Sequence, residues 1–461
     1  MSEQQGRKTF RLRLEQMISV LRGEILTGKR LPGQFLPSER ELVRQFQLSN
    51  KLIRAGLEQL VSEGLIVKIP RVGNKIADTI EASTVAIRFG YHSSLEREAA
   101  IDFLLTEFHN AHPTIRVQPI PIPFQNYYET VKEYMEAGML DIVTMNYNNF
   151  DDFRTNRSLE LLKDFDTDPG VYEMLSRAFT DEDRLLVRPF LFSPLILCYN
   201  RDHLREKGLP EHFNPGSWDE LLRQASRLTV ENKRFGFYFF LLSKNRWPVF
   251  FIQNGAKLRD GREEAAEAVK RMIEAISLCR DIIYASDTFP TFLSGSDAEA
   301  EELFLQGKVS VIMTSYFALN ALRDSGIPFD IAPLPGIKNK HTILMTIGLA
   351  VNKKSKVIVA AETLANFFTS ERAQTIIRQK TLSIPALRKA AQWSGEEAVY
   401  HPPNYPVFQE LLPGCRLFTD LNMTSEELDS ILKEARMHWS RLQTIESLRE
   451  RILEIVYSRN Q

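Results

Sequence analysis

The 461-residue sequence is poor in cysteine, and it lacks both long apolar runs and a secretory signal. Cys198, Cys279 and Cys415 lie far apart without a CxxC pair, which favours buried, reduced thiols over a disulfide framework. No stretch approaches the roughly 20 uncharged apolar residues of a membrane span. The first residues are polar where a signal peptide would be apolar. We therefore expect a cytoplasmic chain that does not enter a membrane.

The motifs of common catalytic and cofactor sites are also missing. There is no Walker A loop, no GxSxG, no HExxH and no Cys/His cluster with zinc spacing. We interpret His109 and His112, which lack acidic or cysteine partners, as surface histidines. No carboxylate pair stands out among the 59 acidic residues. We therefore expect a protein that is not an enzyme and that holds neither a cofactor nor a metal ion.

Charge is distributed unevenly along the chain, although the net charge is only -1. Residues 7–77 contain 14 Lys or Arg and 6 Asp or Glu, a net charge of +8, so the remaining chain is acidic. A basic segment favours nucleic-acid phosphates, and the alternative is a solvated basic surface. At about 100 to 200 residues per domain, the length predicts about three lobes.

The basic head carries the signals of a helix-turn-helix. Apolar residues recur at steps of three and four from Thr9 to Leu26, which predicts an amphipathic helix. Ser38 and Glu41 form a capping-box pair that opens a short helix ending at Phe46. Ser49 can cap a third helix after a short turn. These caps predict three helices of a DNA-binding domain.

The third predicted helix has an apolar inner face and a polar outer face. Its inner face includes Ile53 and Leu57, and its outer face carries Asn50, Lys51 and Arg54. Helix-turn-helix proteins place the start of this helix against base edges in the major groove. The strand and basic turn that follow, residues 65–75, predict a hairpin wing that touches the DNA backbone.

The head resembles the gluconate-repressor (GntR) family of bacterial winged-helix regulators over about 70 residues. The matching segments are Leu36 to Leu42, Ser49 to Arg54, Glu63 to Leu65, and Gly73. The resemblance implies DNA contacts at Arg40, Ser49, Arg54 and the wing around Gly73. Asn50 and Leu52 replace the usual Arg and Thr, so the family's operator sequence is not assumed. The predicted DNA-binding residues are Arg40, Ser49, Asn50, Lys51, Arg54, Arg71, Gly73 and Lys75.

Two of these arginines have a simpler interpretation. A surface salt bridge with a neighbouring glutamate would explain Arg40, and a solvated helix face would explain Arg54.

After a short polar linker, the chain alternates between strand and helix patterns. Strands are predicted at Val85 to Tyr91, Ile115 to Ile120 and Asp141 to Met145, with helices at Leu95 to His109 and Tyr127 to Glu136. This order indicates α/β units, in which ligands bind beyond the carboxyl ends of the strands. Tyr91, His92, Asn146, Tyr147 and Asn148 lie at such ends. Ordinary turn chemistry is the alternative for the two asparagines.

From Thr84 to about Leu442, the chain resembles the family 1 extracellular solute-binding proteins, the sugar receptors of ABC importers. Segments in matching order and spacing carry this resemblance: Gly138 to Val143, Arg188-Pro189, Leu197 to Asp202, Gly208-Leu209, Ser217 to Leu221, Phe304 to Met313, Pro333 to Gly336, and Phe367 to Ser370. The resemblance implies an α/β body of the two-lobed, type II periplasmic-binding-protein class, with a sugar held in a cleft. We predict three parts: a winged helix-turn-helix domain at 1–78, a linker at 79–84, and a two-lobed solute-binding domain at 85–461.

Tryptophans in such a family invite a role in stacking on sugars. Ser217-Trp218 is typical of a capped helix start with a buried anchor, so we expect Trp218 in the core. Trp247 precedes a segment that often lines the cleft in this family, and stacking and packing remain equally open for it. The predicted ligand-binding residues are Tyr91, His92, Asn146, Tyr147, Asn148, Trp247, Thr314, Ser315, Tyr316 and Gly348.

Together these patterns predict a transcription regulator that binds operator DNA as a homodimer and senses a small solute, most simply a sugar or oligosaccharide. The alternative is a solute receptor of an ABC-type transporter whose head has no DNA role. Hydrolysis of an oligosaccharide by the purified chain would favour a third class, an enzyme.

Overall fold

The computed structural model describes residues 13–14, 17–18, 20–25, 29–70, 72–77, 85–259, 261–285, 288–290, 294–395 and 401–458. Its contacts divide the chain into two compact units. The first unit comprises Met1–Phe190, Ile347–Ile377 and Pro385–Trp393, and the second comprises Leu191–Thr346, Arg378–Ile384 and Ser394–Gln461. The predicted linker, residues 79–84, lies outside the described residues.

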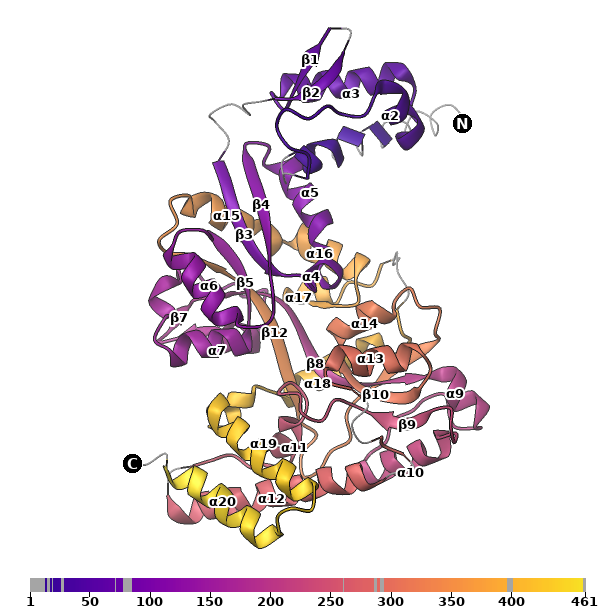
Figure 1. The fold of residues 1–461 in the computed structure, drawn as a ribbon, viewed down its shortest axis with the longest axis vertical. Coiled ribbons are helices and arrows are strands. Elements are labelled where there is room, and N and C mark those ends of the chain that lie inside the picture. Colours follow the sequence, from indigo (N-terminus) through magenta and orange to yellow (C-terminus); the bar gives the residue numbers. More distant parts are fainter. Residues whose placement is uncertain are drawn as a thin grey trace. The chain divides into compact units, whose positions relative to one another are not determined.

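The head of the first unit has the predicted helices and wing (Figure 1). Residues 20–25 are helical, and they are followed by α2 (Glu39–Phe46) and α3 (Asn50–Ser62). The strands β1 (Ile66–Ile69) and β2 (Gly73–Ile76) pair antiparallel, with Ile69 opposite Gly73. This hairpin is the wing that the sequence predicted.

A compact apolar core holds the head together. It joins residues of the first helix, such as Met17 and Leu21, to Leu42 of α2 and Ile53 of α3. A Cβ added to Gly56 would lie 2.2 Å from the Met17 side chain, so the first helix packs directly on the backbone of α3. The polar outer face of α3 is therefore left to solvent.

The first unit's body is built on a mixed sheet in the order β4-β3-β5-β12. β3 (Val85–His92) runs parallel to β4 (Ile115–Ile122) and to β5 (Ile142–Asn146), whereas β12 (Thr342–Val351) runs antiparallel to β5. Its helices and short strands are α4 (Leu95–Glu98), α5 (Ile101–Ala111), α6 (Tyr127–Glu136), α7 (Tyr147–Thr155), η1 (Leu159–Leu161), α8 (Glu173–Ala178), β6 (Thr180–Asp181), β7 (Arg184–Leu185), α15 (Ile358–Phe368), α16 (Glu371–Lys380, which continues into the second unit) and α17 (Arg388–Ala391). The predicted alternation of strands and helices is confirmed.

Two local predictions in this unit were wrong. The single helix predicted from Leu95 to His109 is two helices, because Ala100 adopts a left-handed backbone with φ of 50° between α4 and α5. His109 is fully buried rather than on the surface, and its Nε2 accepts a hydrogen bond from the Val117 backbone at 3.1 Å. Burial, together with the positive charges of Arg116 and Arg22, lowers the pKa of His109 to about 3. The apolar residues near His109 in the sequence of α5 do not indicate that this histidine is buried.

The second unit has its own sheet, centred on β8 (Arg188–Asn200), which begins in the first unit. β8 pairs antiparallel with β10 (Val309–Ser315) and β11 (Phe329–Ala332), and β10 pairs parallel with β9 (Phe235–Tyr238). All residues of β8 after Arg188 are buried, as its nearly continuous apolar run requires. Because β8 and β12 each contribute residues to both units, the chain crosses between the units within strands.

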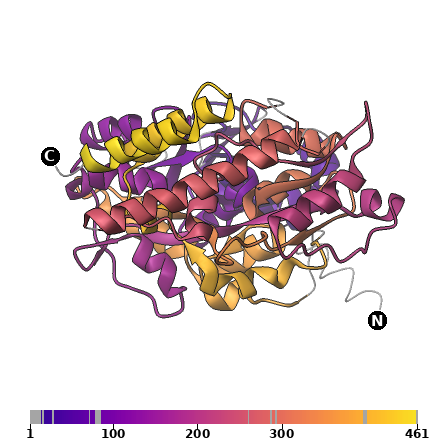
Figure 2. The same cartoon turned by 90° about the horizontal axis from the view of Figure 1, so that it is seen from below.

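Helices surround this second sheet. α12, α19 and α20 lie side by side (Figures 1 and 2), and α10 packs on β9. Trp218 begins α10 and is buried, as predicted. The helices and short strands of this unit are α9 (Arg201–Glu206), α10 (Trp218–Leu228), α11 (Pro248–Asn254), α12 (Arg262–Tyr284), α13 (Asp297–Leu305), α14 (Tyr316–Leu322), β13 (Ile384–Pro385, at the boundary with the first unit), η2 (Tyr405–Val407), α18 (Phe408–Leu411), η3 (Leu412–Gly414), β14 (Cys415–Arg416), η4 (Phe418–Leu421), α19 (Ser425–Trp439) and α20 (Ile445–Ser458).

The state of the three cysteines agrees with the prediction from the sequence. Cys198, Cys279 and Cys415 are free and buried. Within the described ranges, no helix combines the length and the apolar character that spanning a bilayer requires.

Candidate DNA-binding and ligand-binding sites

The caps of α2 and α3 fix the geometry of the head. Ser38 Oγ accepts a hydrogen bond from the Glu41 backbone at 3.3 Å, and Glu41 Oε2 accepts from the Ser38 backbone at 2.7 Å. The hydrogen bonds from Ser38 lower the pKa of Glu41. Ser49 Oγ caps α3 by accepting from the Leu52 backbone at 3.4 Å. Both helices therefore begin where the sequence predicted.

The predicted DNA-reading residues of α2 and α3 share one property, which is exposure to solvent. They are Arg40, Ser49, Asn50, Lys51 and Arg54. The side chain of Arg54 reaches back to α2, where its Nε lies 2.8 Å from Glu39 Oε2. Such an exposed pair contributes little stability, so DNA phosphates or bases can compete with Glu39 for Arg54.

The predicted DNA-binding residues of the wing differ in their exposure to solvent. Gly73 is exposed at the first position of β2 with φ of 144°, a conformation that favours glycine. Lys75 is half-buried and lies opposite Val67 in the hairpin. Arg71 lies outside the described residues.

In the first unit, the predicted ligand residues gather at one edge of the sheet. β3 and β5 run parallel, so their carboxyl ends bring Tyr91 and His92 to the same edge as Asn146. Tyr91 is buried and its hydroxyl donates to Glu96 at 2.9 Å. Asn146 caps α7 by accepting from the Asn149 backbone at 2.8 Å. Both side chains thus have a structural partner already.

His92, Tyr147 and Asn148 complete this edge. Tyr147 is buried and its ring lies 6.4 Å from that of Phe179, whereas His92 and Asn148 are half-buried. His92 Nδ1 lies 2.8 Å from Ser94 Oγ, which donates to Glu98 Oε2 at 3.0 Å. Burial lowers the pKa of His92 and raises that of Glu98 to about 7. His92, Asn146 and Asn148 are the half-buried members of the set and have surface available to a ligand.

Sequence reasoning missed an aromatic residue at this edge. Phe124 follows β4 and is 63% exposed, and its ring meets His92 edge to face with centroids 5.7 Å apart. An exposed phenylalanine beside the carboxyl ends of parallel strands offers a face for the C–H groups of a sugar. Its position directly after the strand in Pro121 to Phe124 was the available signal.

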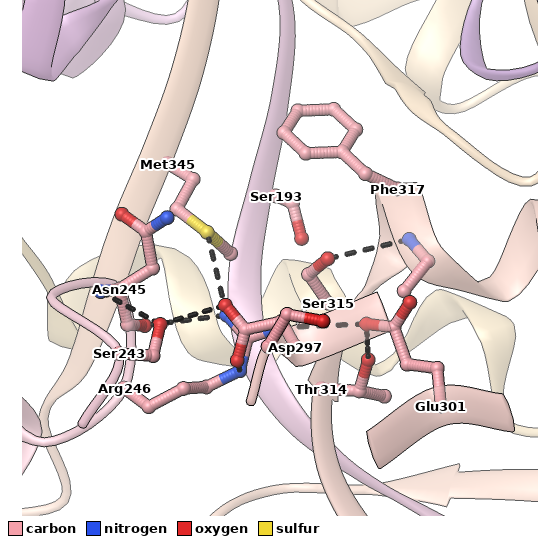
Figure 3. A network of polar contacts seen from close by, with 12 residues as sticks. Ser193, Ser243, Asn245, Arg246, Asp297, Glu301, Thr314, Ser315, Phe317 and Met345 are labelled. Atoms are coloured by element: carbon pink, nitrogen blue, oxygen red, sulfur yellow. Dashed lines mark hydrogen bonds and ion pairs between the residues drawn. The ribbon is translucent and has the colours of Figure 1, made fainter. Parts of the chain in front are cut away.

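In the second unit, a polar cluster surrounds a buried arginine (Figure 3). Arg246 is 4% exposed, with its Nε 3.5 Å from Asp297 Oδ1 and its Nη2 3.6 Å from Glu301 Oε1. Ser243 Oγ donates to Asp297 at 2.6 Å, and Thr314 Oγ1 donates to Glu301 at 3.1 Å. We call Ser243, Arg246, Asp297, Glu301 and Thr314 the polar cluster.

The polar cluster has unused hydrogen-bonding capacity. Arg246 Nε has no hydrogen-bond partner among the described residues, and its ion-pair partner Asp297 Oδ1 lies 3.5 Å away. Leaving a buried donor unpaired is costly, so such a group marks a place where a ligand or water binds. Two carboxylates and a guanidinium supply both acceptors and donors for neighbouring hydroxyl groups. No local sequence pattern joins these positions, which lie on a loop, on α13 and on β10.

The predicted residues Thr314, Ser315 and Tyr316 have different roles. Thr314 belongs to the polar cluster, whereas Ser315 Oγ accepts from the Ala318 backbone and caps α14. Tyr316 is fully buried and its hydroxyl donates to the Tyr405 carbonyl at 2.8 Å. Phe317, the next residue, is half-buried and lies beside Ser193 and Ser315 in Figure 3.

Trp247 and Gly348 pack inside the protein. Trp247 is 2% exposed and meets Phe251 edge to face at 5.0 Å. A Cβ on Gly348 would lie 2.6 Å from the Arg188 carbonyl oxygen, so this glycine permits close strand packing. With Tyr316, these residues support the fold in this structure and offer no surface to a ligand.

The described residues contain no group of three or more His, Cys, Asp or Glu side chains that could hold a metal ion.

Comparison with known families matches both parts of the chain. Residues 92–375 match the family described as bacterial extracellular solute-binding protein, and residues 14–76 match the bacterial regulatory proteins of the gntR family. These are binding and regulatory families. The fold class predicted from the sequence, a two-lobed α/β body with an N-terminal winged helix, is therefore confirmed.

Individual relatives bind sugars according to their names. A galactooligosaccharide-binding protein of Bacillus subtilis is 22% identical over 338 residues, which cover 69% of this chain and 77% of the relative. The substrate-binding protein Lmo0181 of Listeria monocytogenes, in complex with cycloalternan, superposes with a TM-score of 0.65 at 20% identity, covering 82% of this chain and 99% of that protein. Maltose-bound MalE3 of T. maritima superposes with a TM-score of 0.66 at 20% sequence identity. The match covers 81% of this chain and 99% of that protein. These structures share the fold of the body.

Proposed function

Because the chain belongs to the bacterial extracellular solute-binding protein family, we propose that its body senses a small solute and that its gntR-type head binds operator DNA under control of that solute. The observation that carries this proposal is the fusion itself. A capped reading helix with an exposed polar face precedes a body of a solute-binding family. A receptor that only delivers solute to a permease has no use for such a helix.

A sugar or oligosaccharide is the solute class that best fits the candidate ligand residues described in each unit. The first unit offers the exposed ring of Phe124 beside His92, and the second offers the polar cluster with Phe317 nearby. Sugars present hydroxyl groups for charged partners and C–H faces for aromatic rings. The relatives named for galactooligosaccharide, cycloalternan and maltose support this class.

The mechanism we propose is a shift in population between conformations. A ligand that binds one conformation of the body more tightly than another favours that conformation. In a homodimer, such a change would alter how two heads fit half-sites that lie about 34 Å apart, one turn of DNA. The cytoplasm is the compartment where this function is possible.

Binding of a sugar is tested by thermal unfolding of the full chain with maltotriose and with a galactooligosaccharide mixture. A ligand that binds the folded state raises the unfolding midpoint in proportion to its occupancy. We expect at least one sugar to raise it, and Arg246→Met to abolish the rise. A panel of sugars without any shift would contradict the sugar assignment, while leaving DNA binding open.

Operator reading is tested with duplexes selected from a random pool by the full chain. Arg54→Ala is expected to weaken binding to the selected duplex by about 1 to 3 kcal/mol, because it removes a base or phosphate contact. Arg97→Ala, which removes an arginine of the body's α4, is the control and should bind as the unaltered chain does. Equal affinity of both variants would remove Arg54 from the interface.

A solute receptor without a DNA role is the second candidate, and the name of the matched family favours it. It predicts that the chain selects no duplex above non-specific affinity while still binding sugar. The two tests above therefore separate the two functions.

A further inference from the structure

The second unit contains a cavity of about 370 Å³ whose lining residues are distinct from the polar cluster. Three segments form its walls. They are residues 238–242 after β9, the end of α12 with Phe289, and the end of α19. Its volume falls within the range of pockets that hold small organic molecules, about 300 to 1,000 Å³.

The cavity walls are mostly apolar, and several of their polar groups are already paired. Tyr238 and Ser294 share a hydrogen bond of 2.9 Å, and the Trp439 indole donates to the Ile276 carbonyl at 2.9 Å. The Tyr284 hydroxyl donates to the Trp439 carbonyl at 2.6 Å. These walls therefore favour an apolar, planar body, and a sugar would leave its hydroxyl groups without partners.

Among the described residues that line the cavity, Arg436 is the charged one. Arg436 lies on α19 and its guanidinium has no ion pair or hydrogen bond to a described residue. A second cavity, of about 550 Å³, shares Tyr284 with the first and is lined by Arg280, His438 and Arg441. The Arg441 guanidinium stacks 4.4 Å from the Tyr284 ring centroid. Charge complementarity thus favours an anionic group on the ligand.

We propose that this cavity binds a small amphipathic anion, with a planar apolar body between the aromatic walls and a carboxylate, sulfonate or phosphate group at Arg436. The site is separate from the proposed sugar site, and binding there does not depend on sugar binding.

The same chain segment lines the cavity and supplies the polar cluster. Residues 238–242 contact the cavity, and Ser243 and Arg246 follow at once. Between them, Lys244 Nζ is held by Ser425 Oγ at 3.0 Å and Asp429 Oδ2 at 2.6 Å, both on α19. An anion bound between residues 238–242 and the end of α19 would displace this segment and, with it, the polar cluster. This regulatory consequence rests on the proposed function.

The binding claim is tested with 1-anilinonaphthalene-8-sulfonate, an aromatic sulfonate whose fluorescence rises on binding. The full chain should show one saturable site, and Arg436→Gln should weaken it about tenfold through loss of a charge-assisted hydrogen bond. Lys433→Gln removes an exposed cation from the same helix and should leave the affinity unchanged. Equal affinity of these two variants, or no saturable binding at all, would overturn the proposal.

Two further readouts locate the probe. The neutral analogue N-phenyl-1-naphthylamine should bind more weakly and should respond equally to both variants, because it lacks the sulfonate. Maltotriose or galactooligosaccharides should not displace the sulfonate probe. Full displacement by a sugar that binds the chain would assign the cavity to the sugar and overturn its independence. Absence of any sugar binding would contradict the proposed function alone.

Discussion

At the scale of single residues, exposure separates side chains that can meet a ligand from those that support the fold. Of the aromatic residues considered as ligand contacts, Trp247 and Tyr316 are buried, whereas Phe124 is 63% exposed. The sequence identified residue types and strand ends correctly, but burial depends on contacts between distant segments. The Trp247 ring packs against Phe251, and no local sequence pattern predicts that contact.

Phe124→Ala is expected to weaken binding of an effective sugar about two- to tenfold, since a stacked aromatic ring contributes about 0.5 to 1.5 kcal/mol. The unfolding midpoint without ligand should change little because the ring is exposed. Isothermal titration calorimetry measures the affinity. Phe103→Ala, which removes another exposed ring of the first unit, is the control. A loss of the same size in both variants would show that Phe124 has no specific role.

Glu98 should make stability depend on pH. Burial raises its pKa from the usual 4.5 to about 7, against smaller lowering effects of Ser94 and Arg97. Between pH 4.5 and pH 7, Glu98 keeps its proton in the folded state but has released it in the unfolded state. The protonated side chain therefore contributes fully to the free energy of unfolding below about pH 4.5, and this contribution is lost as the pH rises through 7. Ser94 hydrogen-bonds to both His92 and Glu98, so loss of the Glu98 proton also changes the surroundings of His92.

The measurement is chemical denaturation at pH 5 and pH 8. From the lower to the higher pH, the unaltered chain should lose about 2 kcal/mol more stability than Glu98→Gln, which cannot release the proton. Glu129→Gln, at an exposed position of α6, should behave as the unaltered chain does. A Glu98→Gln variant with the same pH profile as the unaltered chain would contradict the assignment.

At the scale of elements, local signals predicted the structure well wherever a cap or a strict period was present. α2 and α3 begin directly after Ser38 and Ser49, and α6 spans the predicted residues. The break between α4 and α5 could not be predicted, because Ala99 and Ala100 are good helix formers. The left-handed Ala100 is fixed by the packing of both helices around it, which the sequence does not display locally.

The cap of α2 should be required for a stable head. Ser38→Ala removes the hydroxyl from a capping box and is expected to cost about 1 kcal/mol. Ser38→Asn keeps a capping oxygen and should restore most of this stability. Hydrogen exchange of α2 amides measures the effect within the head. Equal exchange rates in both variants would show that the cap does not stabilise α2.

At the scale of the whole molecule, the central question is how the body communicates with the head. Within the first unit, Arg22 joins three segments. Its Nε and Nη2 bind Glu63, directly after α3, at 2.8 and 2.6 Å, and its Nη1 donates to Asn110 of α5 at 2.6 Å. Arg22 is 8% exposed, so these bonds are largely shielded from water. We propose these bonds, which join α5 to the residue after α3, as the contact through which sugar binding affects the head.

Asn110→Ala should weaken this communication while leaving the Arg22–Glu63 pair intact. We expect operator affinity without sugar to change by less than about 1 kcal/mol, the typical value of one hydrogen bond, and the response to sugar to fall. Fluorescence anisotropy with labelled operator measures both quantities. Asn156→Ala, at an exposed position after α7, should leave both unchanged. A full sugar response in Asn110→Ala would assign the communication to another contact.

The most direct test of a sugar-controlled regulator is the operator affinity of the full chain, measured by anisotropy with and without a sugar that raises its unfolding midpoint. Coupling between two sites typically changes affinity about 5- to 150-fold, and we expect a change of at least fivefold here. An identical operator affinity with and without a saturating sugar would contradict the proposed control of DNA binding.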